Sequence, residues 1–414
     1  MVVEIISVGT EILMGNIVNT NASYLSERCS RLGLICYFQS VVGDNKERVK
    51  EAVNGAIKRA DIVLMTGGLG PTQDDLTKQT VAEAFGLQLY ESESIKKGLE
   101  EFFAKRGIKI TENNYRQALI PEGATILENT NGTAPGIYVN KDNTHVFLMP
   151  GPPNEMKPMF ELSIAPIIEM LSGEIIYSDM VKIAGVGESS AETRILDLLE
   201  NQINPTIAPY AKTGEVHFRV SAKAKSIEEA KKLVNPVTEE LKFRFGRDVY
   251  TIKEDETLSE VIIGICKKRQ YKISMAESCT GGLLAATLVE VAGVSEIFDR
   301  SYITYADSAK VKELDVKQET LDLFGAVSEE VAYEMVVGVA NKTKADISVS
   351  ITGIAGPDGG SEEKPVGLVY IACKFHEHIE INKYQFSGNR SKIRESAVQK
   401  ALTMVRLALV DYMD

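Results

Sequence analysis

Histidine and cysteine are scarce in this sequence of 414 residues, which contains four histidines and five cysteines. They form no HxxxH or CxxC motif and no other cluster. A structural zinc site needs about four such ligands close together, so we expect none. The cysteines also show no pattern of a disulfide framework, and this favours a reduced, cytoplasmic location.

Long apolar runs and basic runs are missing as well. No stretch approaches the roughly 18 uninterrupted apolar residues of a membrane span, and the N-terminal segment MVVEIISVGTEIL lacks the basic start of a signal peptide. We therefore expect no contact with a membrane. With 46 Lys+Arg against 58 Asp+Glu, the net charge is -12. This acidity argues against a nucleic-acid partner, but small anions held by backbone amides remain compatible with it.

The length and the strand and helix patterns predict three parts. Residues 1–170 alternate apolar strands with amphipathic helices, which predicts an α/β fold with a parallel, doubly wound sheet. Residues 171–253 are typical of a small α+β connecting module. Residues 254–414 begin a second αβ pattern and end in a long helix. Hydrophobic residues at 44% and charged residues at 25% fit a globular protein.

The segment DIVLMTGGLGPTQDDLT contains the first candidate site. A buried strand leads into Gly67, Gly68 and Gly70, where a backbone without side chains lets amides approach a ligand closely. Asp74 and Asp75 follow at the start of a helix, and their oxygens suit Mg²⁺ bridging a pyrophosphate. Taken alone, such a turn is more often only structural, with Asp74 as a helix N-cap.

Two further loops favour a ligand site over a simple turn. Gly9-Thr10-Glu11 follows the first strand, and Pro150–Glu155 follows a later one. In a doubly wound sheet, loops after parallel strands lie along one edge, where ligands bind. We expect these loops to meet the glycine-rich loop.

The segment MAESCTGG contains a second candidate site. Ser278 lies at a strand-to-helix turn, where the amides of the helix N-terminus could hold an oxyanion; the alternative is that Ser278 only caps the helix. Cys279 is an alternative nucleophile, although it needs a neighbour that stabilises a thiolate. His376 and His378 are typical of an exposed turn, so a Ser-His pair is not favoured.

A lysine is the better candidate base. Lys310 lies in the first turn of a helix after the strand end at Tyr305, where a positive charge is disfavoured and proton acceptance is eased. Serine–lysine dyads are known variants of catalytic triads, and the alternative is a solvated surface lysine. Thr352 and Gly353 end another strand before a glycine-rich loop. Arg390, in FSGNR, suits a phosphate.

These motifs resemble one known family. GTEIL, TGGLGPTQDDLT and MPGPPNEM, over residues 1 to about 170, resemble the molybdopterin-binding-like domain of the competence/damage-inducible protein A (CinA) family. AESCTGG, SYITYADSAK, ITGIAGPDGGSEEKPVG and FSGNR, in that order over about 254–414, resemble its C-terminal nicotinamide mononucleotide deamidase domain. The segment between them resembles the KH-like module of full-length members, but its acidic helices and the lack of a clear GxxG argue against RNA binding.

For the N-terminal domain, the resemblance implies a metal-dependent ADP-ribose pyrophosphatase that uses Mg, Mn or Co. Asp74 and Asp75 would hold the metal. The implied ligand-binding residues are Gly67, Gly68, Gly70, Thr72, Thr77 and Glu11.

For the C-terminal domain, the resemblance implies hydrolysis of nicotinamide mononucleotide to nicotinic acid mononucleotide and ammonia, without a cofactor. Ser278 would be the nucleophile and Lys310 its base, with Tyr305 as a polar partner and a second candidate proton acceptor. The implied substrate contacts are Ser295, Thr352, Gly353, Arg390, Thr280 and Gly281. We expect a homodimer. The alternative is a non-catalytic regulatory protein that binds a nucleotide or pterin and is associated with competence or DNA damage.

Overall fold

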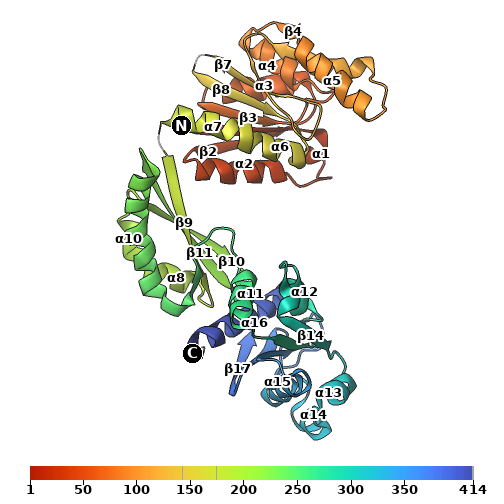
Figure 1. Cartoon of the computed structure of the whole chain (residues 1–414), viewed down its shortest axis with the longest axis vertical. Coiled ribbons are helices and arrows are strands. Elements are labelled where there is room, and N and C mark those ends of the chain that lie inside the picture. Colours follow the sequence, from red (N-terminus) through yellow and green to blue (C-terminus); the bar gives the residue numbers. More distant parts are fainter. Residues whose placement is uncertain (142, 174, 413–414) are drawn as a thin grey trace. The chain divides into compact units, whose positions relative to one another are not determined.

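The computed structural model describes residues 1–141, 143–173 and 175–412, and the chain divides into two compact units (Figure 1). The first unit comprises Met1–Tyr177 and Lys223–Lys231, and the second Ser178–Ala222 and Lys232–Asp414. Among the described residues, no helix combines the length and apolar character needed to cross a bilayer.

The first unit is built on a six-stranded sheet. Its strands, in spatial order, are β2 (Ile35–Val42), β1 (Val2–Val8), β3 (Ile62–Thr66), β8 (Thr144–Met149), β7 (Gly136–Lys141) and β6 (Thr125–Leu127). The first four are parallel, as predicted. β7 and β6 add an antiparallel edge that the prediction of a parallel sheet missed. β7 ends only shortly before β8 begins, and so short a connection leaves no room for the crossover that parallel strands need.

Helices cover both faces of this sheet, so the doubly wound prediction is confirmed. On one face, Ile5 and Leu64 pack with residues of α2 and α6. On the other, Ile6 and Met65 pack with residues of α3 and α4. The helices of this unit are α1 (Thr10–Leu13), α2 (Thr20–Arg31), α3 (Lys46–Ala56), α4 (Thr77–Phe85), α5 (Glu93–Lys105), α6 (Pro153–Met159) and α7 (Ala165–Ser172), with a π-helical segment, η2 (Phe160–Ile164), between the last two. A small β4 (Leu89–Glu91)–β5 (Leu119–Pro121) pair and the 3₁₀ helix η1 (Glu112–Ala118) lie beyond α4 in sequence.

The KH-like middle module contains a four-stranded sheet, most of which belongs to the second unit. Its strands, in spatial order, are β10 (Thr206–Lys212), β11 (Glu215–Ala224), β9 (Ile175–Ala184) and β12 (Val249–Thr251). The module's helices are α8 (Glu188–Arg194), α9 (Leu196–Glu200) and α10 (Ile227–Phe245). This mixture of strands and helices agrees with the predicted α+β module.

The C-terminal part of the second unit contains a five-stranded sheet. Its strands, in spatial order, are β14 (Phe298–Ile303), β13 (Ile273–Glu277), β15 (Ile347–Gly353), β16 (Leu368–Phe375) and β17 (His378–Gln385). The first three are parallel, and the last two antiparallel. Its helices are α11 (Leu258–Arg269), α12 (Leu283–Val289), α13 (Asp307–Leu314), α14 (Gln318–Phe324), α15 (Glu329–Thr343) and α16 (Arg390–Asp411). Residues of α11, α12 and α16 cover one face and residues of α15 the other.

Candidate functional site

The three loops predicted to share one edge of the first sheet do so. They follow the carboxyl ends of β1, β3 and β8 and enclose a cavity of about 430 Å³. The predicted residues that line this cavity, which we call the acidic cavity, are Glu11, Gly67, Gly68, Gly70, Asp74 and Asp75.

Gly67 shows why glycine is needed in this loop. Its φ is +95°, and a Cβ added there would lie 2.1 Å from the backbone oxygen of Val8. Any other residue would push the loop after β3 away from the loop after β1. The glycine therefore sets how closely these two walls of the cavity approach each other.

Two predicted ligand contacts, Thr72 and Thr77, hold the loop together and do not line the cavity. Thr77 is fully buried and donates a hydrogen bond from Oγ1 to the Gly67 oxygen at 2.9 Å. Thr72 Oγ1 lies within hydrogen-bonding distance of both Asp75 Oδ2, at 2.6 Å, and Asp74 Oδ1. The hydrogen bond from Thr72 is the main reason that the pKa of Asp74 is lowered. The helix α4 has Leu76 as its N-cap, so the interpretation of Asp74 as a cap is wrong.

Five carboxylates line the acidic cavity: Glu11, Asp44, Asp74, Asp75 and Glu155. Among the described residues that form its wall, none is a lysine, arginine or histidine. Asp44, after β2, was not predicted; it accepts hydrogen bonds from the amide and hydroxyl of Thr10, each at 2.8 Å. Only the folded structure reveals this contact, because no glycine-rich motif surrounds Asp44.

A divalent cation would meet few protein ligands in the acidic cavity. In the described part of the chain, no three His, Cys, Asp or Glu side chains lie close enough to form a complete metal site. Mg²⁺ usually takes only one or two carboxylates and completes its shell with water and substrate phosphates. Asp74 and Asp75, adjacent in sequence on the cavity wall, fit that kind of site.

In the second unit, Ser278 lies at the centre of a row of hydroxyl residues. Its amide donates to the Ile351 oxygen at 3.0 Å, and the amide of Thr304 donates to the Glu277 oxygen at 2.9 Å. These bonds continue the parallel ladder, so Thr304, Ser278 and Thr352 end three adjacent strands. Ser278 is 8% exposed, and its hydroxyl makes no hydrogen bond to any described residue.

Lys310 is buried, with 1% of its surface exposed, so its interpretation as a solvated surface lysine is wrong. Its Nζ lies 3.1 Å from Asp307 Oδ1 and 3.4 Å from the Tyr305 oxygen. In the described part of the chain, no hydrogen bond joins Lys310 to Ser278. The structure therefore places Lys310 beside the strand end at Tyr305, with its ammonium turned towards Asp307.

Arg390 and Arg394, one turn apart on α16, approach the same strand ends. Arg390 donates to the Tyr305 hydroxyl and to the Gly356 oxygen, each at 2.8 Å. Arg394 donates to the Thr280 oxygen at 2.6 Å, just after Ser278. The predicted Arg390 thus lies with Tyr305, and Arg394 is a further cation that the sequence analysis did not select.

Glu277, immediately before Ser278, was also missed. Its carboxylate is fully buried and accepts hydrogen bonds from the amides of Gly282 and Leu284 at 3.0 Å and of Ala285 at 2.9 Å. The expectation that the α12 N-terminus could hold an oxyanion is therefore wrong for these amides, because Glu277 already occupies them.

The remaining predicted residues differ in their positions. Thr352 is fully buried and donates from Oγ1 to the Ala326 oxygen at 2.7 Å. Ser295 is exposed in the short η4 (Val294–Glu296), before β14. The next residue but one, Ile297, pairs with the start of β13, so Ser295 lies at the opposite end of the strands from Ser278. The structure does not bring these two serines together.

Cys279 and the two C-terminal histidines offer no competing chemistry. Burial raises the pKa of the Cys279 thiol to about 12, so the thiolate needed by a cysteine nucleophile is not populated near neutral pH. His376 and His378 are exposed at the β16–β17 turn, as predicted.

Comparisons with known proteins match all three parts of the chain. Residues 4–170 match the model of a probable molybdopterin binding domain, 178–251 that of the damage-inducible protein CinA KH domain, and 255–409 that of the CinA C-terminal domain. A putative competence-damage inducible protein of Caldicellulosiruptor saccharolyticus is 47% identical over 412 residues, which are 100% of both chains. A CinA-like protein of Kosmotoga olearia is 47% identical over 410 residues, 99% of both chains. The crystal structure of a competence/damage inducible protein from Agrobacterium tumefaciens is 43% identical and covers 36% of this chain and 90% of its own, with a TM-score of 0.35.

Proposed function

Because the chain belongs to the CinA family and carries a molybdopterin-binding-like domain, we propose that it is a hydrolase of pyridine-nucleotide recycling. Its C-terminal domain would deamidate nicotinamide mononucleotide. The observation that carries this proposal is that Lys310 and Arg390 both contact Tyr305, just after β14, while Ser278 ends the neighbouring strand β13. Together they would supply a nucleophile, a base and a phosphate contact.

In the proposed reaction, Ser278 Oγ attacks the carboxamide carbon of nicotinamide, and its proton passes to the amine nitrogen of Lys310. This step requires Lys310 to turn from Asp307 towards the serine. The C–N bond then breaks, and ammonia leaves with the proton that Lys310 returns. Water, deprotonated by the same lysine, hydrolyses the resulting ester to release nicotinic acid mononucleotide and the free serine.

The developing oxyanion needs a donor other than the amides capped by Glu277. The amide of Thr280 donates to no described residue and follows Ser278 closely, so we assign it this role. Arg390 would bind the substrate phosphate, since its planar guanidinium can grip two oxygens at once.

Ammonia release from nicotinamide mononucleotide by the purified protein tests the deamidase proposal. Ser278→Ala should lower turnover by at least about 1,000-fold. Cys279→Ser, next to it, should leave turnover within a few fold and serves as the matched control. Near-normal turnover by Ser278→Ala would refute the serine mechanism. Substrate binding without ammonia release by the wild type would favour a non-catalytic regulatory protein.

For the N-terminal domain we propose metal-dependent cleavage of the ADP-ribose pyrophosphate. The carrying observation is the acidic cavity, whose wall has five carboxylates and no basic side chain among the described residues. An anionic pyrophosphate would be repelled there unless a divalent cation entered with it. Asp74 and Asp75 would hold the cation, which when bound neutralises phosphate charge and polarises the phosphorus–oxygen bonds.

The test is hydrolysis of ADP-ribose with Mg²⁺, Mn²⁺ or Co²⁺ and with a chelator. Asp75→Asn should abolish cleavage and leave ammonia release unchanged, because the two sites lie in separate units. Ser278→Ala should show the reverse pattern. Cleavage that persists in the chelator, or in Asp75→Asn, would contradict the proposal.

A further inference from the structure

A second cavity in the second unit lies away from both sites described above. It has a volume of about 600 Å³, lies between strands of the KH-like module and the helices α11, α12 and α16, and is lined by no predicted site residue. Thr287 and Glu290, in its wall, lie at the carboxyl end of α12, whereas Ser278 precedes the other end of this helix. We call it the module cavity.

One wall of the module cavity is a buried hydrogen-bonded network centred on Glu215 of β11. The carboxylate lies 2.6 Å from His217 Nε2 and 2.9 Å from the Tyr250 hydroxyl, and it accepts a third hydrogen bond from Gln399 of α16 at 2.5 Å. Although burial opposes ionisation, the hydrogen bonds from His217 and Tyr250 lower the pKa of Glu215. This carboxylate is thus ionised, and its oxygens already have three partners.

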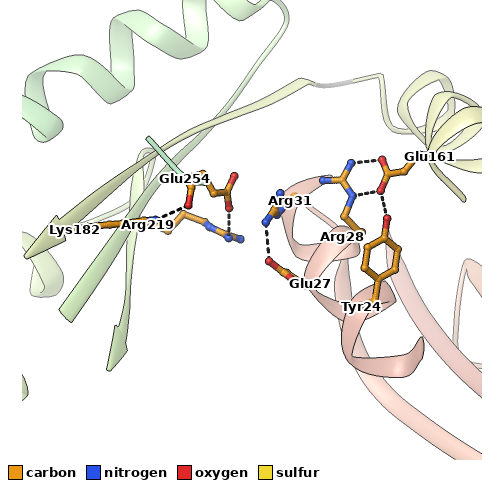
Figure 2. Close-up of polar contacts among 8 residues, drawn as sticks. All are labelled: Tyr24, Glu27, Arg28, Arg31, Glu161, Lys182, Arg219 and Glu254. Atoms are coloured by element: carbon orange, nitrogen blue, oxygen red, sulfur yellow. Dashed lines mark hydrogen bonds and ion pairs between the residues drawn. The ribbon is translucent and has the colours of Figure 1, made fainter. Parts of the chain in front are cut away.

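Two lysines bring positive charge to the wall of the module cavity. Lys182 of β9 is 5% exposed, and its Nζ donates to the backbone oxygens of Glu254 and Glu256 at 2.6 and 2.8 Å. Figure 2 shows that the Glu254 carboxylate instead meets Arg219, at 2.7 Å. Lys212 lines the same cavity, and no hydrogen bond or ion pair joins its side chain to the described residues.

Neither lysine forms an ion pair with a carboxylate among the described residues. Burial and the charge of Lys212 lower the pKa of Lys182, and the charges of Glu215, Asp255 and Glu254 act in the opposite direction. A buried cation is costly unless an anion lies beside it. The other acidic groups of the wall do not contact the lysines directly: Glu260 accepts hydrogen bonds from the amide and hydroxyl of Thr257, and Glu290 lies at the end of α12. An anionic ligand group beside Lys182 and Lys212 would contact both ammonium groups.

The rest of the wall can contact an organic group. Leu258, Val291 and Leu402 contribute apolar side chains to it. A volume of about 600 Å³ falls within the range of small-molecule sites, which is roughly 300–1,000 Å³. A free phosphate ion would fill only a small part of this space.

We propose that the module cavity is a second ligand site, which binds an organic phosphate of mononucleotide size with its phosphate at Lys182 and Lys212 and its base against the apolar wall. This site is separate from the proposed catalytic sites, and its existence does not depend on either activity.

Calorimetric titration of the full chain with AMP, GMP, CMP and UMP tests the proposal, with inorganic phosphate as a separate arm. At least one nucleotide should bind, and Lys182→Met and Lys212→Met should each weaken it about tenfold or more, equivalent to about 1.4 kcal/mol. Lys212 is exposed, so its replacement keeps the test valid if the Lys182 variant fails to fold. Lys253→Met is the matched control, because Lys253 pairs with Glu256 and does not line the cavity.

Arg390→Gln should leave this binding unchanged, which separates the module cavity from the proposed phosphate contact near Ser278. Three results would overturn the proposal: no binding of any nucleotide, binding unaffected by Lys212→Met, or inorganic phosphate binding as tightly as the best nucleotide. The last result would mean that the lysines hold a simple anion and that the apolar wall plays no part.

Discussion

Arg390, at the start of α16, donates a hydrogen bond from Nη2 to the Tyr305 hydroxyl at 2.8 Å across 85 positions of sequence. Its other terminal nitrogen donates to Gly356, in the glycine-rich loop after β15. The guanidinium of Arg390 therefore joins the loops after β14 and β15 to the helix α16. If the substrate phosphate binds at Arg390, the affinity depends on the orientation that these two hydrogen bonds give the guanidinium as well as on its positive charge.

We expect Arg390→Lys to raise the KM for nicotinamide mononucleotide about tenfold, with a much smaller change in kcat. Lysine keeps the positive charge but cannot donate in two directions from one plane. Steady-state ammonia release measures both constants. Lys392→Met, on the same turn of α16, is the control and should change neither. A loss confined to kcat would instead assign Arg390 to the chemical step.

Much of both candidate sites could be predicted from local sequence, because apolar runs followed by glycine show where parallel strands end. That pattern located Ser278, Thr352 and the three loops of the acidic cavity. The contact of Arg390 with Tyr305 could not be predicted, since nothing local links residues so far apart. The antiparallel β7 was missed for a different reason. Alternation of strands and helices indicates parallel pairing, but the short connection between β7 and β8 makes this pair antiparallel.

Glu277 shows another limit of the sequence. A glutamate at the end of an apolar strand looks like an ordinary polar boundary residue. Its role appears only when the chain turns back and directs the amides of Gly282, Leu284 and Ala285 at the carboxylate. Asp44 of the acidic cavity is a similar case, because its partner Thr10 lies in another loop.

We predict that Glu277→Gln lowers the free energy of unfolding of the second unit by about 2 kcal/mol, since charged hydrogen bonds contribute about 1.5–3 kcal/mol. The amide keeps one acceptor oxygen but turns an NH₂ group towards backbone donors. Urea unfolding followed by circular dichroism measures the loss. Glu290→Gln, at the other end of α12, is the control. Turnover should also fall in Glu277→Gln, because the carboxylate positions the turn that contains Ser278. Unchanged stability and turnover would show that Glu277 is not needed as a cap.

Thr72 offers a test of the acidic cavity through pH. Its hydroxyl is the main cause that lowers the pKa of Asp74, so Asp74 stays ionised to a lower pH than an ordinary aspartate. Thr72→Val should raise this pKa, and Mn²⁺ binding should then be lost at a higher pH as the solution is acidified. Calorimetric Mn²⁺ titrations between about pH 3.5 and 6, around the ordinary carboxyl range, measure the shift. Thr72→Ser keeps the hydroxyl and should behave like the wild type; an identical acid limit for Thr72→Val would contradict the assignment.

Lys78, the second residue of α4, is 2% exposed, and its Nζ donates to the oxygens of Arg116 and Gln117 at 2.9 and 3.1 Å. Burial lowers its pKa to about 8, whereas an unfolded lysine titrates near about 10.4. Between these values the unfolded chain binds more protons than the folded one, so the contribution of Lys78 to stability improves as the pH rises. Below about pH 8 both states carry the charge, and the full cost of burying it remains.

We therefore expect the free energy of unfolding of the first unit to rise in the wild type, relative to Lys78→Met, by at most about 3 kcal/mol between pH 8 and 10.5. The measurement is urea unfolding of both full-length proteins across this range, compared as a difference so that other titrating groups cancel. Lys46→Met, which replaces a half-exposed lysine paired with Glu83, is the control and should not reproduce this pH-dependent difference. Parallel pH profiles for the wild type and Lys78→Met would mean that Lys78 keeps its proton in the folded protein. In that case the oxygens of Arg116 and Gln117 would be holding a permanent ammonium next to the acidic cavity.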